Sequence, residues 1–427
     1  MTIILNAGQE NAIKQIHEFL NSDEQCMVIS GPAGTGKTTV VKHVVGSLEK
    51  YYKTRKLLNM DAQELKIVFT ATTNKACEAL MHSLGAHNEV RTIHSHLRLV
   101  MSRNPQTFKD ELSDSDPNMV LRQQLIFIDE ASFIDDELLD YILSKVGPGT
   151  KVIFMGDPAQ LKSPGSENLP VFNSGFREVH LTEIMRQDKD NPIQALSAAL
   201  RECVLNRTKL PPCNWDQQHI HWYPREEFNR IMLMDMSNPE WTYSTSKLLA
   251  FRNKRVQEYN KTLNEKIVGT RNFQAGDYAV NNHYVRGTKS TGALPTDRTV
   301  FIDEINESEE LGVKGHRVYL NGNGSSFFLP DDHTKIDRKK NALIRNLTGD
   351  FAADKEMRRA IDTVTDTWVD LRPVFAQTVN KSQGSTYRRV YIDLADLSFC
   401  RDYDQKIRLL YVAISRAQMQ VFLTGDL

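Results

Sequence analysis

The stretch GPAGTGKTT at 31–39 places glycines, a lysine and hydroxyl side chains directly after the apolar run CMVIS at 26–30. The sequence of this stretch matches the pattern G-x-x-x-x-G-K-[ST]. Backbone N–H groups of such a loop surround phosphate oxygens, the lysine neutralises the β- and γ-phosphates, and the threonine ligates Mg²⁺. The sequence therefore predicts a site for ATP and Mg²⁺. Its predicted residues are Gly31, Pro32, Ala33, Gly34, Thr35, Gly36, Lys37, Thr38 and Thr39.

Two neighbouring acids end the apolar run LIFIDE at 125–130. Asp129 is expected to hold the metal through water, together with Thr38, and Glu130 is expected to polarise a water molecule for attack. This arrangement favours hydrolysis of the nucleotide, catalysed with the help of Lys37, over simple binding. The alternative is that the two acids only begin a helix, where acidic side chains are common.

Three further polar side chains could act on the terminal phosphate. Gln160 ends the segment GDPAQ after a predicted strand, where its amide could reach a γ-phosphate. Arg186 in LTEIMRQ and Arg416 in AISRA could supply the positive charge that hydrolysis usually takes from outside the phosphate loop. Each of the three, taken alone, could equally be an ordinary loop or surface side chain.

The composition limits the class of protein. The chain has 427 residues, 40% of them hydrophobic, which predicts about two to four packed domains. Lys and Arg total 53 against 54 Asp and Glu, so nucleic-acid binding would need a local basic path. The five scattered cysteines include no CxxC pair, which favours a reduced interior without structural zinc. No basic leader and no run of roughly 20 apolar residues occurs, so we expect a cytoplasmic protein without a membrane segment.

Strand-like and helix-like stretches alternate along the chain, and this rhythm predicts α/β domains with parallel sheets. Apolar residues are spaced as in a helix at 9–20, and another helix is expected at 39–48. The first predicted strands are 27–30, 66–71, 125–130 and 151–157. A second series of α/β stretches lies at 248–260, 372–379, 389–394, 408–417 and 420–425.

The motifs as a set resemble, in order and wording, a superfamily 1 helicase of the 5′-to-3′ branch that holds RecD and the phage Dda helicases. LNAGQENAI is similar to the Q motif, and it is followed by GPAGTGKTT (motif I), TATTNKACEAL (motif Ia), RTIHSHL, IDEAS (motif II) and GDPAQLKSPG (motif III). The similarity continues with LTEIMRQ, FRNKRVQEYN, FAQTVNKSQGST (motif V) and LLYVAISRAQMQVFLTG (motif VI). Asn380 stands where this branch usually has histidine, and LKSPG departs from the usual proline pair of motif III.

The resemblance implies two RecA-like domains that face each other across one ATP, with Arg186 and Arg416 as arginine fingers. It places Gln9 on the adenine and adds Gly384 to the nucleotide site. It also implies a groove for single-stranded DNA, contacted mostly through phosphate and sugar. The implied DNA contacts are Thr72, Asn74, Lys75, Thr92, His94, Thr378, Lys381, Ser382 and Gln383. His94 could instead be a buried polar cap.

The implied domain limits follow from the same resemblance. Residues 1–91 and 123–185 are expected to form the first RecA-like domain, and residues 186–270 and 371–427 the second.

Two segments that carry no motif interrupt these domains. The polar, turn-rich region within 92–122 is expected to be a small pin that splits duplex, in which Phe108 contacts bases. Residues 271–370, with short β-like pieces and one charged helical stretch, are expected to be an SH3-like accessory insertion. Trp368 could anchor that insertion between domains or be an ordinary core side chain.

We therefore expect an ATP-dependent motor that translocates 5′-to-3′ on single-stranded DNA and unwinds duplex in replication, recombination or repair. Expected partners are single-stranded and fork DNA and a single-strand-binding or other replication protein. The chain is expected to act as a monomer, in the host cytoplasm if it is phage-encoded. Two alternatives stay open: a RecD-like subunit active only within a complex, and a non-motor P-loop ATPase switch, for which motifs V and VI would be superfluous.

Overall fold

The computed structural model describes residues 5–58, 64–85, 88–103, 110–163, 165–184, 191–211, 216–269, 272–288, 291–322, 324–350 and 352–427. The chain divides into two compact units. Unit 1 comprises Met1–Trp222, Ser382–Arg388 and Leu397–Phe422, and unit 2 comprises Tyr223–Lys381, Arg389–Asp396 and Leu423–Leu427.

A six-stranded sheet forms the centre of unit 1, and each of its described strand pairs is parallel. The strand order is β3 (Val90–Thr92), β2 (Lys66–Ala71), β6 (Gln124–Asp129), β7 (Lys151–Gly156), β1 (Cys26–Ser30) and β8 (Arg177–His180). All five residues of β1 are buried, as expected for a parallel strand covered on both faces. The parallel sheet predicted from the first series of strands is confirmed.

Apolar side chains that alternate along these strands divide the core of unit 1 into two layers. Met27 and Ile29 of β1 pack in the layer that contains residues of helices α1 to α3. Cys26 and Val28 pack in the opposite layer, with residues of α4, α5 and α6. The helices are α1 (Ala7–Leu20), α2 (Lys37–Leu57), α3 (Asn74–Leu84), α4 (Ile93–His96), α5 (Asp136–Lys145) and α6 (Pro170–Asn173), with the 3₁₀ turn η1 (Ala131–Phe133).

Helix α1 illustrates how local sequence places an element. Asn6 caps its first turn, because the Asn6 side chain accepts from the Gln9 backbone N–H and the Gln9 side chain accepts from the Asn6 N–H. Ala12, Ile16 and Phe19 then lie on one buried stripe. The cap and the stripe together fix where α1 begins and which face it buries.

A hairpin of β4 (Leu99–Arg103) and β5 (Asp110–Asp114) lies within the segment predicted as a pin. Its base is held by Lys145, whose buried ammonium lies 2.8 Å from an Asp114 carboxylate oxygen. Phe108, the residue expected to contact bases, lies outside the described residues.

Two helices of unit 1 pack against each other: α7 (Pro192–Asn206) and α13 (Tyr403–Ser415). Eight consecutive residues of α13, from Ile407 to Ile414, are buried, as expected for a helix that is covered almost all round.

The second series of α/β stretches forms a five-stranded sheet. The strand order is β16 (Ala376–Thr378), β10 (Ser246–Ala250), β17 (Tyr387–Asp393), β18 (Ala417–Thr424) and β9 (Ile220–Trp222). Strand β10 pairs in parallel with both β16 and β17. The remaining elements of this part are α8 (Arg225–Met236), α9 (Asn253–Ile267), α12 (Leu394–Leu397) and the 3₁₀ turn η2 (Asn380–Ser382).

Unit 2 also contains an antiparallel sheet in the segment predicted as an insertion. Its order is β14 (Ser325–Pro330), β13 (Val313–Leu320), β12 (Thr299–Glu310), β11 (Tyr278–Asn281) and β15 (Leu371–Pro373). The Trp368 ring lies 4.7 Å from that of Phe328 and is fully buried among apolar side chains. Trp368 is therefore a core residue of the insertion, the second of the two roles considered from the sequence.

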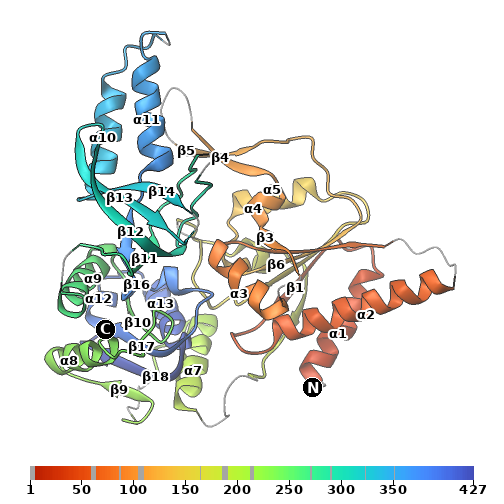
Figure 1. Ribbon diagram of the computed structural model, residues 1–427. Helices are drawn as coiled ribbons and strands as arrows, with labels where there is room; N and C mark the ends of the chain where they lie inside the picture. The colour runs from red at the N-terminus through yellow and green to blue at the C-terminus, as the bar shows by residue number, and fades with distance from the viewer. Residues whose placement is uncertain are drawn as a thin grey trace. The chain divides into compact units, whose positions relative to one another are not determined.

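The prediction of one charged helical stretch in this insertion is wrong. Two helices, α10 (Thr334–Arg345) and α11 (Lys355–Thr367), lie side by side beyond the antiparallel sheet (Figure 1). The turn between them is fixed by Asp354, whose carboxylate accepts from the backbone N–H groups of Thr348 and Gly349, at 2.9 Å each. These side-chain-to-backbone bonds hold the turn that precedes α11.

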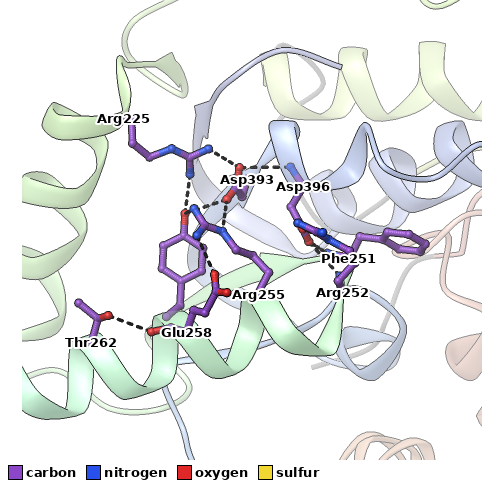
Figure 2. Close-up of polar contacts among 9 residues, drawn as sticks. Arg225, Phe251, Arg252, Arg255, Glu258, Thr262, Asp393 and Asp396 are labelled. Atoms are coloured by element: carbon purple, nitrogen blue, oxygen red, sulfur yellow. Dashed lines mark hydrogen bonds and ion pairs between the residues drawn. The ribbon is translucent and has the colours of Figure 1, made fainter.

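A network of ion pairs in unit 2 joins the end of β17 to two helices (Figure 2). The carboxylate of Asp393 accepts from Arg225 Nη2 at 2.7 Å, Arg255 Nε at 2.9 Å and the Tyr259 hydroxyl at 2.8 Å. Asp396 accepts from the backbone N–H groups of residues 251 and 252. The network fixes the starts of α8 and α9 relative to the sheet.

The domain limits inferred from the resemblance stay a prediction. Residues 382–388 and 397–422, expected in the second domain, pack with the first sheet in unit 1. Within the part of the chain that the structure describes, no helix is both long and apolar enough to cross a bilayer.

Candidate active site

A cavity of about 720 Å³ opens in unit 1 at the carboxyl ends of β1, β6 and β7, within the usual size range of small-molecule sites. It is lined by the phosphate loop, by the two acids after β6, and by residues of α7 and α13. The loop residues that line it are Pro32, Ala33, Gly34, Gly36, Lys37, Thr38 and Thr39. Most of the predicted phosphate loop therefore faces one cavity.

The backbone of the loop is shaped by two glycines. A Cβ at Gly31 would lie 2.3 Å from the Leu181 carbonyl oxygen, so no side chain fits there. Gly36 has φ +82°, a left-handed conformation that glycine adopts without strain. Thr35 is buried and donates from its hydroxyl to the Pro32 carbonyl at 3.0 Å, so it supports the loop from behind.

Gln9 braces the loop from helix α1. Its side-chain amide donates to the Thr35 carbonyl at 3.0 Å, and its carbonyl accepts from the Asn6 N–H at 3.1 Å. Gln9 is buried and is not among the residues that line the cavity. The contact with adenine, expected from the resemblance, stays a prediction.

Lys37 lies at the mouth of the loop, where its ammonium donates to the carbonyls of Gly31 at 2.6 Å and Pro32 at 3.1 Å. Burial lowers the pKa of Lys37, while the nearby carboxylates of Asp157, Asp129 and Glu130 raise it. These acids keep a positive charge favourable at the position where phosphate oxygens are expected.

Asp129 and Glu130 stand together at the end of β6. The Asp129 carboxylate accepts from the Glu130 backbone N–H at 2.9 Å, which orients both residues. Burial raises the pKa of Asp129 and, with the Asp129 charge, raises the pKa of Glu130 to about 7. Glu130 has φ 55° and ψ 46°, in the left-handed region that non-glycine residues seldom occupy. A carboxylate with such a pKa can exchange a proton near neutral pH.

The residues present fit Mg²⁺. Thr38 and Asp129 both line the cavity and offer one hydroxyl and one carboxylate. Mg²⁺ usually takes one or two protein oxygens and completes its shell with water and substrate phosphates. Among the described residues no group of three or more His, Cys, Asp or Glu side chains gathers as a metal site, and this mode of binding needs none.

Gln160 is buried and lines the cavity, as predicted. Its side-chain oxygen accepts from the Gln383 amide at 3.4 Å, and its backbone carbonyl accepts from Arg408 Nη1 at 2.8 Å. Gln160 therefore connects the cavity both to the segment similar to motif V and to helix α13.

Arg416 is buried and lines the same cavity, directly after α13. Its guanidinium donates to the carbonyls of Val412 and Ser385 and to the Ser415 hydroxyl. Burial lowers the pKa of Arg416, and the Glu130 carboxylate opposes this shift. Gly384 also lines the cavity, whereas Arg186 lies outside the described residues.

The charged or polar cavity residues that were not singled out from the sequence include Asp157, Arg201 and Tyr411. Asp157 is fully buried and accepts from Arg201 Nε at 3.1 Å and from the Tyr411 hydroxyl at 2.5 Å. Asp157 lies in the quoted segment GDPAQ, so this motif could have identified it as a residue of the site. Tyr411 likewise lies in the segment similar to motif VI, whereas Arg201 lies on α7, outside every quoted motif.

The residues expected to contact DNA in unit 1 lie around the carboxyl ends of β2 and β3. The Thr72 hydroxyl donates to the Glu130 carbonyl at 3.3 Å, and Thr92 caps α4. Asn74 and Lys75 begin α3. His94 is half-buried, and burial lowers its pKa, so the neutral ring is favoured. The His94 ring is thus partly exposed, so a contact between this ring and DNA stays a prediction.

The remaining predicted DNA contacts are used within the protein. Ser382 and Gln383 are buried in unit 1, and Gln383 bonds to Gln160. In unit 2, the Lys381 ammonium lies 2.8 Å from both Asn282 Oδ1 and Asp297 Oδ1, and the Thr378 hydroxyl accepts from the Lys381 N–H. A DNA contact by Lys381 would therefore compete with these bonds.

Comparison with known families agrees with this geometry. Residues 4–209 match the family described as an AAA domain, and residues 373–424 match the UvrD-like helicase C-terminal domain. The chain is 23% identical over 459 residues to the ATP-dependent DNA helicase dda of Enterobacteria phage T4, covering 98% of each chain. It is 28% identical over 190 residues to the RecBCD enzyme subunit RecD of Buchnera aphidicola, which is 41% of this chain and 29% of that one.

The resemblance to superfamily 1 helicases of the RecD and Dda type is thereby confirmed. The fold of the chain is also that of a Pif1 helicase from Bacteroides, solved in complex with ADP-AlF3 and ssDNA. The TM-score is 0.51 at 16% identity, with 100% of this chain and 94% of that one covered. The prediction of two RecA-like domains with a β-rich insertion is confirmed, and the strands of that insertion are antiparallel.

Proposed function

We propose that the chain is an ATP-dependent DNA helicase that translocates 5′-to-3′ on single-stranded DNA and unwinds duplex. One observation carries this proposal. A single cavity brings Lys37, Glu130, Gln160 and Arg416 together, although these residues come from segments far apart in the sequence. The similarity to a phage DNA helicase along nearly the whole chain supports DNA as the track.

Bound ATP with Mg²⁺ would supply the phosphoanhydride bond whose hydrolysis drives the motor. The loop N–H groups and Lys37 hold the phosphates, and Thr38 and Asp129 hold the metal. Glu130 orients the attacking water and accepts its proton, and Arg416 stabilises the charge that develops on the phosphoryl group.

Coupling to DNA would run through the link between Gln160 and Gln383. Gln160 faces the cavity, and Gln383 belongs to the segment expected to contact the strand, so a shift of one amide moves the other. We further propose that Thr72, Asn74, Lys75, Thr92, His94, Thr378, Lys381, Ser382 and Gln383 contact single-stranded DNA, and that the hairpin β4–β5 with Phe108 meets the fork.

We propose a cytoplasmic monomer, phage-encoded, that acts at replication or recombination forks with a single-strand-binding protein. A RecD-like subunit that needs a complex is the second candidate, favoured by the 28% identity to RecD over 190 residues. A non-motor ATPase switch is disfavoured, because it would not need the residues similar to motifs V and VI.

The deciding experiment compares ATP hydrolysis with and without single-stranded DNA, and then unwinding of partial duplexes with a 5′ or a 3′ tail. We expect strong stimulation by DNA and unwinding of the 5′-tailed duplex alone. Unwinding from the 3′ tail would contradict the polarity, and absence of stimulation by any nucleic acid would contradict the motor. Lys37→Ala is the control that excludes a contaminating ATPase.

A further inference from the structure

One helix lines the cavity without a role in the proposed mechanism. Helix α7 presents a stripe of six residues to it: Ile193, Gln194, Ser197, Ala198, Arg201 and Glu202. The spacing of these residues is that of one helix face. Arg201 is the cation of this stripe.

The guanidinium of Arg201 is held from one side. Its Nε donates to Asp157 Oδ1 at 3.1 Å, and the Asp157 carboxylate also accepts from the Tyr411 hydroxyl at 2.5 Å and the Ala159 N–H at 3.0 Å. Asp157 is 0% exposed, so this carboxylate cannot turn to water. A buried carboxylate with three donors fixes the orientation of the arginine that it binds.

The other side of the guanidinium remains available. Arg201 Nη1 lies 3.9 Å from Glu202 Oε1, which is beyond hydrogen-bonding distance. Within the described ranges, Nη1 and Nη2 make no hydrogen bond to the protein, although the side chain is only 15% exposed. Arg416 differs, because all three of its guanidinium nitrogens donate to protein oxygens.

Arg201 and Lys37 line the same cavity. Burial lowers the pKa of Lys37, Asp157 opposes this shift, and the Arg201 charge adds to it. Burial and Asp157 raise the pKa of Tyr411, and Arg201 and Arg416 oppose that shift. The four groups thus share one electrostatic environment.

We propose that Arg201 is a further nucleotide-contacting residue, whose guanidinium binds the terminal phosphate of ATP, with Asp157 and Tyr411 as positioning residues. The proposal rests on the proposed nucleotide site. Among the residues that the structure describes, it adds a third cation at the phosphates, supplied by α7, to Lys37 and Arg416. The planar fork of arginine suits phosphate oxygens, and its fixed Nε leaves both Nη groups for them.

The test compares Arg201→Gln with a matched control on the same helix, Arg207→Gln. Arg207 caps the end of α7, is exposed and does not line the cavity. Dissociation constants of ADP and of a non-hydrolysable ATP analogue are measured by calorimetry with Mg²⁺. We expect Arg201→Gln to weaken the analogue about tenfold or more, as for one lost charge-assisted hydrogen bond, and ADP less than about twofold.

Equal weakening of both nucleotides, or no weakening, would overturn the proposal. If the glutamine variant does not fold, Arg201→Lys decides, because it keeps the charge beside Asp157 but loses the fork. A reduced preference for the analogue over ADP then supports the proposal, and an unchanged preference overturns it. Failure of the wild-type chain to bind either nucleotide would instead overturn the nucleotide site itself.

Discussion

Two fully buried aspartates, one in each unit, lie at the end of a strand, but their arginine partners are used differently. Asp157 follows strand β7 in unit 1, and Asp393 ends strand β17 in unit 2. Each accepts hydrogen bonds from arginine and tyrosine side chains on neighbouring helices. A buried carboxylate needs such partners, because burying an unpaired charge is costly.

The two groups differ in how completely their arginines are used. Around Asp393, Arg225 also donates to the Tyr259 hydroxyl, and Arg255 also donates to Tyr259 and Glu258, so the network closes on itself (Figure 2). Around Asp157, the Nη side of Arg201 faces a cavity. The same grouping of residues therefore links helices to the sheet in unit 2, whereas in unit 1 we propose that it also binds a ligand.

Among the substitutions in the cavity of unit 1, Lys37→Ala should reduce ATP turnover the most. The lost ammonium is the charge next to the bound phosphates, so we expect ATP turnover to fall by at least about 10³-fold. Steady-state ATP hydrolysis with single-stranded DNA present measures it. Turnover within tenfold of wild type would show that the cavity is not the hydrolytic site.

Asp157→Asn and Asp393→Asn separate the two roles directly. Asp393→Asn leaves Arg225 without a counter-charge and takes one of two carboxylates from Arg255, so we expect about 2–4 kcal/mol less free energy of unfolding, with ATP turnover per folded molecule nearly unchanged. Asp157→Asn should lower turnover about 10- to 100-fold, because Arg201 loses its anchor. Urea unfolding and ATP hydrolysis are measured on both variants. An equal loss of turnover in Asp393→Asn and Asp157→Asn would contradict the different roles inferred for the two aspartates.

The pH dependence should report Glu130. Its pKa is raised from 4.5 to about 7, so its ionised, proton-accepting form is lost below neutral pH. We expect kcat to fall about tenfold per pH unit below 7 and to level off above it. Because the folded-state pKa is the higher one, the contribution of Glu130 to stability is full below about 4.5 and is lost as the pH rises through about 7. A kcat profile that is flat between pH 5.5 and 8.5 would exclude Glu130 as the base.

Glu258→Gln should have the smallest effect. Glu258 pairs with Arg255 Nη1 at 3.0 Å, but its side chain is 48% exposed. Exposed ion pairs stabilise little, so we expect a change in unfolding free energy below about 0.5 kcal/mol. A loss above about 1 kcal/mol in urea unfolding would show that Glu258, and not Asp393 alone, stabilises the ion-pair network.

Local sequence was sufficient for the parts of the site that one segment builds. The phosphate loop between β1 and α2, and the acids at the end of β6, were predicted because apolar runs and glycine spacing mark them. Gln160 and Arg416 could be assigned only with the help of the family resemblance, since a lone glutamine or arginine carries no signal.

Contacts between distant segments could not be predicted in the same way. Arg201 meets Asp157 across 44 positions and Tyr411 meets it across 254, and no periodicity encodes such pairs. The helix pair in unit 2 was missed because its turn depends on Asp354, a residue that looks ordinary in the sequence. The DNA contacts stay a prediction, and Arg186 and Phe108 lie outside the described residues.

The left-handed backbone of Glu130 has a consequence for engineering. Holding a non-glycine side chain in that region costs of the order of 1 kcal/mol, so Glu130→Gly or Glu130→Asn would relieve strain at this position. Selection for heat resistance alone is therefore expected to discard the carboxylate that we propose to activate water. Thermostability and turnover are opposed at this one position, and a library selected for both should retain Glu130.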